Sequence, residues 1–397
     1  MSTSRAFTAL LLAAGLSSAG CARSYAGQSA ISFQDLDYTS ESTKQPWPVK
    51  RLPLKEIALQ YNTATVPEVA YVDLPGATPE AKTVVFIHGL GSYLKFWRSQ
   101  LDVFHQQGYR VIAVDLPGYG KSDKPGTFPY TMEAMADVVR ELVNALGLDK
   151  PILAGHSMGG QTSLSYAIRY PDALSGLVLV SPAGFEKFSW KEKAWFERVM
   201  STEFIKTAPE SAIWGSVRQG NFMTWRPELE WLIEERVRLA RSPEFDSYAY
   251  ANVRTVRGLA HNDFVRDNLH HVTVPTLIVY GTDDRLIPNP FLHGGEARDI
   301  MEYGASRIPG AKLVPLKGCG HTVQLDCPAR FNEAVLPFVS AVAQGQIAVP
   351  EGTPPKEEAP TPVAPSTPAS GPTTPESVPP ATPGQEGAPA PADAPRP

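Results

Sequence analysis

A serine framed by glycines follows an apolar segment near the middle of this 397-residue chain. Residues 151–154 are apolar, and residues 155–160 read GHSMGG, which places Ser157 in a G-x-S-x-G pattern. A serine at the crest of a sharp strand-to-helix turn has a strained backbone, and glycines two positions away relieve the crowding. The helix that follows directs its free N–H groups to the same point. The pattern predicts a nucleophile at Ser157, although a Gly-Ser turn without chemistry can share it.

A serine hydroxyl is a weak nucleophile at neutral pH, so it needs a histidine as base, and the histidine needs a carboxylate to hold its tautomer. Among eight histidines, His321 is the candidate base because it lies in a loop of small residues after a strand expected at 311–314. Asp283 and Asp284 follow another expected strand, at 276–280. The residue pattern alone leaves both aspartates open, as acid or as ordinary turn residues.

The other histidines are expected to take no part in proton transfer. His156 adjoins Ser157, but its side chain is expected to point elsewhere and to be structural. Five more are expected in helices or loops, mostly at the surface: His105, His261, His270, His271 and His293. Cys319 and His321 alone provide too few ligands for zinc, so we expect neither a metal site nor a cofactor.

The order Ser157, Asp284, His321 along the chain is that of the α/β-hydrolases, and residues from about 50 to 345 resemble this family. The resemblance implies that Asp284 is the acid, because the family's acid lies three residues after a glycine, here Gly281, and is often followed by arginine. No Asp or Glu stands between the strand expected at 177–180 and residue 186, which argues against the family's alternative acid position.

The resemblance also implies two backbone N–H donors for the oxyanion of a tetrahedral intermediate. One is the N–H of Met158, and the other is expected in residues 88–92, which read HGLGS, with Leu90 as the donor and His88 as a brace of the loop. Residues 115–122 match a further family loop with a structural role. They lack the glycine that a Walker phosphate loop requires at position 115, so nucleotide binding is excluded.

The elements that position these residues alternate between strand and helix, which predicts a doubly wound, mostly parallel α/β sheet with its site at the carboxyl ends of strands. The expected strands are 56–61, 69–73, 83–88, 109–114, 151–155, 177–180, 276–280 and 311–314, and the expected helices are 131–147, 158–168 and 329–342. Residues 185–270 break the alternation and hold five of the seven tryptophans. We expect a helical lid there, with a minority of its tryptophans lining an apolar pocket.

Residues 1–20 combine a basic residue, an apolar stretch too short to span a bilayer and small residues, as in a secretory signal peptide. Their ending resembles a bacterial lipoprotein signal, which implies lipid attachment at Cys21 and export to the cell envelope. Ordinary cleavage nearby, with secretion and a free Cys21, is the alternative. In an exported protein a disulfide between Cys319 and Cys327 is permitted.

The far end differs from the body in composition. Sixteen of the 38 prolines lie in residues 350–397 and no aromatic residue follows Phe338, so we expect 346–397 to form a disordered tail. Residues 21–50 are expected as a linker, and 51–184 and 271–345 as the two parts of the core around the lid at 185–270. The whole chain has a net charge of −5, and the tail accounts for −4 of it. The nearly neutral body lacks the basic patch typical of nucleic-acid binding.

A serine nucleophile excludes, by resemblance, the family branches that use an aspartate there, such as most epoxide hydrolases and haloalkane dehalogenases. The neutral body and the aromatic lid favour a small, uncharged, fairly apolar ester as the substrate. We therefore expect an esterase or lipase. A membrane is expected as a partner only through a lipid on Cys21. The alternatives within the family are carbon–carbon bond hydrolases of meta-cleavage products, iminopeptidases and perhydrolases. A surface-anchored binding protein on the same scaffold is the alternative of another class.

Overall fold

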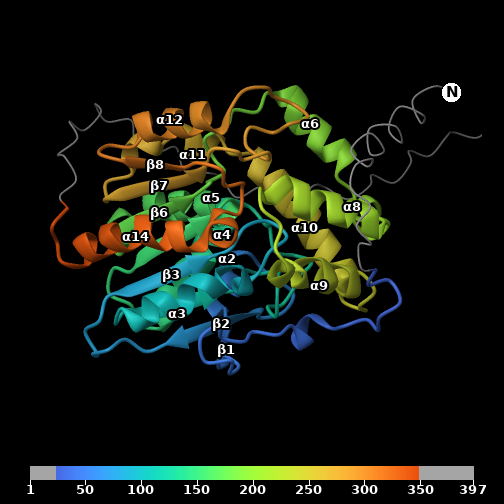
Figure 1. The fold of residues 1–397 in the computed structure, drawn as a ribbon, viewed down its shortest axis with the longest axis horizontal. Helices are drawn as coiled ribbons and strands as arrows, with labels where there is room; N and C mark the ends of the chain where they lie inside the picture. Colours follow the sequence, from blue (N-terminus) through green and yellow to red (C-terminus); the bar gives the residue numbers. More distant parts are fainter. Residues whose placement is uncertain (1–23, 348–397) are drawn as a thin grey trace, which may run out of the picture. The chain divides into compact units, whose positions relative to one another are not determined.

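The computed structural model describes residues 24–347. An eight-stranded sheet forms the centre of this part, in the order β1-β2-β4-β3-β5-β6-β7-β8 (Figure 1). β2 runs antiparallel to β1 and to β4, and all other neighbouring strands are parallel. The strands are β1 (Val49–Pro53), β2 (Glu68–Leu74), β3 (Thr83–Ile87), β4 (Arg110–Val114), β5 (Ile152–His156), β6 (Gly176–Val180), β7 (Thr276–Gly281) and β8 (Lys312–Leu316). The predicted doubly wound, mostly parallel sheet is confirmed.

Helices cover both faces of the sheet. α3 and α14 pack together on one face, and α4 and α5 on the other (Figure 1). The helices of this core are α2 (Lys55–Gln60), α3 (Arg98–Gln106), α4 (Met132–Ala145), α5 (Met158–Arg169), α12 (Ala297–Arg307), α13 (Val323–Asp326) and α14 (Pro328–Ala343), with short 3₁₀ turns η1 (Phe33–Asp35), η2 (Leu94–Trp97) and η3 (Pro171–Ala173).

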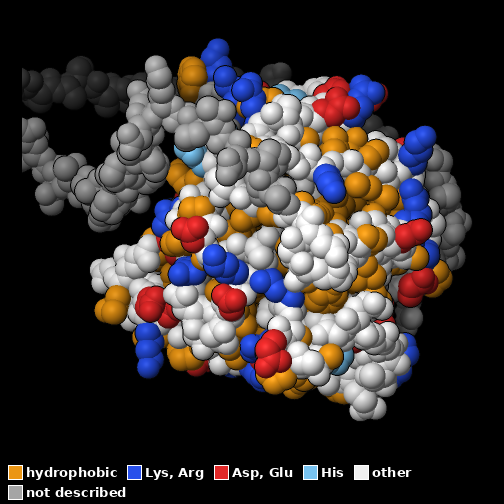
Figure 2. Space-filling model, turned by 90° about the vertical axis from the view of Figure 1, so that its left-hand side faces the viewer, with side chains coloured by type: hydrophobic (Ala, Val, Ile, Leu, Met, Phe, Trp, Pro, Cys, Tyr) orange, Lys and Arg blue, Asp and Glu red, His pale blue; other side chains and the backbone are white. Residues whose placement is uncertain are grey.

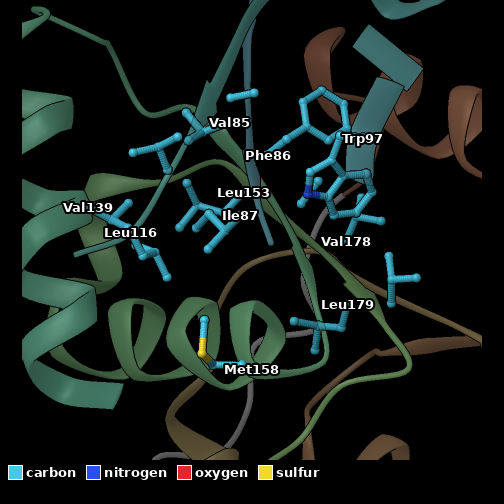
Figure 3. Close-up of a cluster of buried hydrophobic side chains, with 14 of the residues drawn as sticks. Val85, Phe86, Ile87, Trp97, Leu116, Val139, Leu153, Met158, Val178 and Leu179 are labelled. Carbon is cyan, nitrogen blue, oxygen red and sulfur yellow. The ribbon is translucent and has the colours of Figure 1, made fainter. Parts of the chain in front are cut away.

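The central strands are buried on both faces, which explains why their sequences are apolar without alternation. Every residue of β3, β5 and β6 is buried. The side chains drawn from this core include Val85, Phe86, Ile87, Trp97, Leu116, Val139, Leu153, Met158, Val178 and Leu179 (Figure 3). The side chain of Met158 belongs to this cluster, so the first turn of α5 is anchored in the core.

A helical segment is inserted between β6 and β7 and lies at the end of the sheet where the parallel strands finish (Figure 1). We refer to this segment as the lid. Its helices are α6 (Trp190–Val199), α7 (Thr202–Lys206), α8 (Glu210–Trp214), α9 (Trp231–Leu239), α10 (Phe245–Ala260) and α11 (Asp263–Asp267), with the π turn η4 (Gly215–Gln219) and the 3₁₀ turns η5 (Pro227–Leu229) and η6 (Leu269–His271). On the side of the core that lies opposite the lid, acidic and basic side chains are mixed and do not form separate patches of one charge (Figure 2).

Two expectations for the early part of the chain are wrong. Residues 56–61, expected as a strand, instead form helix α2 up to Gln60 and its C-cap Tyr61, because the carboxylate of Glu141 accepts the N–H groups of Glu56 and Ile57 and satisfies the first turn. The edge strand β1 was not expected at all. In the segment 21–50, expected as a linker, the described residues pack Phe33 and Trp47 into the core, and residues 49 and 50 begin β1.

The features expected at both ends of the chain lie outside the described residues. The signal peptide, Cys21 and nearly all of the tail fall in residues 1–23 and 348–397. Within residues 24–347, no helix is both long and apolar enough to cross a membrane.

Candidate active site

Ser157 lies at the junction of β5 and α5, with a backbone φ of 52° and ψ of −112°. This conformation is strained for a residue with a side chain. A Cβ on Gly155 would come within 2.2 Å of the carbonyl oxygen of Gly159, and a Cβ on Gly159 within 2.3 Å of the carbonyl oxygen of Ile87. Only glycine fits at either position, so the pattern around Ser157 has the mechanical origin that the sequence predicts.

Asp284 and His321 are brought together from the ends of β7 and β8. His321 Nδ1 donates to Asp284 Oδ2 at 2.7 Å, and the two side chains are 5% and 0% exposed. The other carboxylate oxygen of Asp284 accepts the backbone N–H groups of Leu286 and Ile287 at 2.8 and 3.1 Å. This arrangement fixes the imidazole so that Nε2 is the nitrogen left for proton transfer. The exposed Asp283 binds other groups and not His321.

The expected oxyanion donors flank Ser157. A Cβ on Gly89 would lie 3.3 Å from the Cβ of Ser157, so the loop that carries Leu90 runs beside the serine. Met158 opens helix α5 directly after it. The backbone N–H groups of Leu90 and Met158 donate to none of the described residues, so both are free for a ligand. Two such donors beside one hydroxyl suit a tetrahedral oxyanion.

Ser157 and His321 both line a cavity of about 330 Å³ between the sheet edge and the lid. They form no hydrogen bond with each other, a looseness that is common before a substrate binds. The apolar walls include Leu90, Phe188, Phe196, Val256, Leu259, Leu286, Ile287 and Phe291. Among the described residues, no lysine or arginine lines this cavity.

The expectation that lid tryptophans line the cavity is wrong, because its rings are those of phenylalanines. Trp214, Trp225 and Trp231 instead pack around two small apolar clusters, which join lid residues to Tyr25 in one case and to Leu325 in the other. Trp190 is 75% exposed. These three tryptophans therefore stabilise the lid and its contacts with neighbouring segments, whereas Phe188 and Phe196 shape the pocket.

Two buried histidines connect the loops of the site. His88 Nε2 accepts the N–H of Leu116 at 3.0 Å, which is the bracing role expected for it, and burial lowers its pKa to about 4. His156 Nε2 lies 3.1 Å from the carbonyl oxygen of His321. Burial, with the neighbouring His321, holds the pKa of His156 well below its ordinary value. His156 was expected to point away from the site, yet it lines the cavity.

Comparison with known proteins identifies the family. Residues 82–328 match the family described as the alpha/beta hydrolase fold. The chain belongs to the α/β hydrolase family. Among curated relatives, a 2-hydroxy-6-oxononadienedioate/2-hydroxy-6-oxononatrienedioate hydrolase of Paraburkholderia phymatum is 27% identical over 65% of this chain and 87% of the relative.

Two further relatives broaden the range of reactions. The protein named "Putative carbamate hydrolase RutD" of Caulobacter sp. is 27% identical over 68% of this α/β hydrolase and 94% of the relative. Among solved structures, a thermophilic esterase from Thermogutta terrifontis has a TM-score of 0.59 and 26% identity over 74% of this chain and 99% of its own. The relatives' names agree on hydrolysis and differ in the bond that is cleaved.

Some residues that hold the site of this α/β hydrolase were not predicted. Asp326 Oδ2 accepts the N–H of Gly320 at 2.7 Å and the N–H of Met223, in the lid, at 2.9 Å. The disulfide that the sequence permits does form: it joins Cys319 to Cys327 and closes the loop that contains His321. The loop of the candidate base is therefore fixed from both the core and the lid. Asp326 carries no sequence signal of its own, because its lid partners Met223 and Thr224 lie 103 and 102 residues away in the chain.

His293, expected among the surface histidines, is half-buried between two carboxylates of the hydrolase lid. Its ring contacts Glu186 through Nδ1 and Glu192 through Nε2, the latter at 3.1 Å. Glu186 follows β6 and lines the cavity, but it binds His293 and not His321. Among residues 24–347, no group of three or more His, Cys, Asp or Glu side chains is arranged to hold a metal ion.

Proposed function

We propose that this chain is a serine hydrolase that cleaves carboxylic esters of uncharged, fairly apolar substrates. The observation that carries the proposal is that His321, bound to Asp284, lines the same largely apolar cavity as Ser157, beside two free backbone N–H groups. The groups that an acyl-transfer site needs are then all present. Ser157 is the nucleophile, His321 the base and Asp284 the orienting acid, and two backbone N–H groups can bind the oxyanion.

The proposed reaction has two halves. His321 Nε2 takes the proton of Ser157 Oγ as the oxygen attacks the ester carbonyl, and the N–H groups of Leu90 and Met158 bind the resulting oxyanion. The C–O bond breaks, the alcohol leaves with the proton from His321, and Ser157 carries the acyl group. Water then attacks the acyl group, gives its proton to His321, and the acid departs as Ser157 recovers its proton.

The charge of the cavity supports an uncharged substrate. The Paraburkholderia relative is named for a substrate with two carboxylate groups, and a dianion in a pocket without lysine or arginine would lose its hydration without a cationic partner. A neutral ester makes no such demand. The esterase from Thermogutta terrifontis is a relative whose name fits this choice.

The names of the curated relatives favour a second candidate, in which the same residues cleave a carbon–carbon bond or a carbamate. The test is a substrate panel with purified protein: 4-nitrophenyl esters of two to twelve carbons, a neutral alkyl carbamate, and 2-hydroxy-6-oxo dienoic acids. The proposal expects ester turnover with the highest kcat/KM. Turnover of the dienoic acids or the carbamate alone would establish the second candidate instead.

We also propose that the mature protein is anchored to the bacterial cell envelope by lipid on Cys21. The support is the lipoprotein-like sequence before this cysteine. Cys21→Ser is expected to move the protein from the membrane fraction to the soluble fraction after expression in a Gram-negative host. Unchanged fractionation of the variant would contradict lipid attachment.

A further inference from the structure

The loop that carries the Leu90 N–H is held by the lid as well as by the core. From the core, the N–H of Leu94 donates to Asp115 Oδ1 at 2.7 Å, and His88 is bound to Leu116. These contacts fix the two ends of the loop. They leave its middle, around residues 91–93, to other partners.

Those partners come from helix α9 of the lid. The side chain of Glu235 accepts a hydrogen bond from the hydroxyl of Tyr93 and binds Lys95 Nζ at 2.7 Å. The adjacent Arg236 donates to the carbonyl oxygen of Gly91 at 3.3 Å. Two consecutive residues of one helix thus hold the loop on the carboxyl side of Leu90.

The contacts of Glu235 are shielded from water, so they are stiff. The side chains of Glu235 and Lys95 are 11% and 4% exposed. Lys95 Nζ also lies 4.5 Å from the ring centre of Trp231, one turn earlier on α9. A buried ion pair with further partners is costly to break, because removal of one charge leaves the other without compensation.

We propose that Glu235 is a positioning residue for the oxyanion hole, acting through Tyr93 and Lys95 on the backbone of Leu90. This inference rests on the proposed function, because it assigns the Leu90 N–H to the oxyanion. An oxyanion donor acts only when it is aimed at the place where charge develops, and an error of about 1 Å costs about 100-fold in rate. The lid is then part of the catalytic apparatus and not only the roof of the cavity.

The test compares two ketones of equal chain length. 1,1,1-Trifluorooctan-2-one adds to a serine hydroxyl to form a hemiketal whose oxygen takes the oxyanion position, whereas octan-2-one binds without that charge. For Glu235→Gln, the affinity for the trifluoroketone is expected to fall about 10- to 100-fold, and kcat/KM for an ester by a similar factor. The affinity for octan-2-one is expected to change less than threefold.

Asp137→Asn is the matched control. Asp137 is a carboxylate buried still more deeply than Glu235, 3% exposed, that binds Arg169 and two tyrosine hydroxyls away from the cavity. Its loss should lower stability without altering the ratio of the two ketone affinities. If Glu235→Gln does not fold, the pair Lys95→Met with Glu235→Leu removes both charges together and still deprives Tyr93 of its acceptor. This double variant is expected to lose affinity for the trifluoroketone and to keep its affinity for octan-2-one, as Glu235→Gln does.

The outcomes separate the inference from the proposed function. A wild-type protein that binds both ketones equally lacks an oxyanion hole, which overturns both claims. A wild-type protein that prefers the trifluoroketone, with Glu235→Gln keeping the full preference, overturns only the role of Glu235. An equal loss of preference in Asp137→Asn would also overturn that role, because the effect would then follow from any buried charge.

Discussion

Asp284 binds His321 at 2.7 Å, while its neighbour Asp283 is exposed and bonds to the backbone of Gly318 at 2.9 Å. Two adjacent carboxylates at one strand end thus have different partners. Of these two carboxylates, only Asp284 is bound to His321, and the proposed function therefore depends on Asp284.

Asp284→Asn is expected to lower kcat/KM for an ester by roughly 10³- to 10⁴-fold, because an amide no longer holds the productive tautomer of His321. Asp283→Asn is the control, with an expected loss below about tenfold. The measurement is steady-state hydrolysis of a 4-nitrophenyl ester by each folded variant. Equal losses in the two variants would contradict the assignment.

Gly155→Ala is expected to lower the free energy of unfolding by about 1–3 kcal/mol. The new methyl group would meet Gly159 and Ser163 at 2.2 and 2.5 Å. Gly126→Ala is the control, since nothing lies within 4 Å of its Cβ position, and its effect should stay within about 0.5 kcal/mol. Urea unfolding followed by circular dichroism checks both. A Gly155→Ala protein as stable as the control would show that the turn is not tightly packed.

The paired change Cys319→Ser with Cys327→Ser is expected to lower the free energy of unfolding by about 2–3 kcal/mol, because it opens a short loop in the unfolded chain. Ester hydrolysis should also fall, since His321 lies inside this loop. Dithiothreitol should lower ester hydrolysis by the wild-type protein and should not change ester hydrolysis by the paired variant. Wild-type activity that persists once thiol titration shows both cysteines free would rule out this role of the disulfide.

The contribution of His293 to stability is expected to depend on pH. Burial lowers its pKa, but the hydrogen bond and charge of Glu186, with those of Glu192, outweigh this, so the pKa of His293 is raised above 6.5. A raised pKa means that the folded state holds the proton more tightly, so stabilisation is complete below pH 6.5 and is lost as the pH rises through the raised pKa. Burial raises the pKa of Glu186 above 4.5, which sets the lower limit of the window.

His293→Gln should therefore destabilise most between these limits, by about 0.5–1 kcal/mol. Urea unfolding midpoints at pH 6 and pH 9 give the comparison. His105→Gln serves as control, because the buried Nδ1 of His105 has no hydrogen-bond partner among the described residues. A destabilisation by His293→Gln that is the same at both pH values would exclude the ionic role.

The sequence predicts the parts of this protein that depend on local order. The parallel strands, the turn at Ser157 and the loop of His321 are encoded by neighbouring residues, and strand order then brings their ends to one sheet edge. Contacts between distant segments could not be predicted in this way. Helix α2 depends on Glu141, 85 residues beyond Glu56, and the pair of Lys95 with Glu235 spans 140 residues.

The most direct test of the central claim is covalent labelling with a fluorescent fluorophosphonate, followed by mass spectrometry of the labelled peptide. The wild-type protein is expected to react at Ser157, and Ser157→Ala to remain unlabelled. Asp284→Asn should react much more slowly than the wild type, while Asp283→Asn should react at a similar rate. A folded wild-type protein that takes up no label, or a Ser157→Ala protein that is labelled as fast as the wild type, would contradict the proposed serine hydrolase.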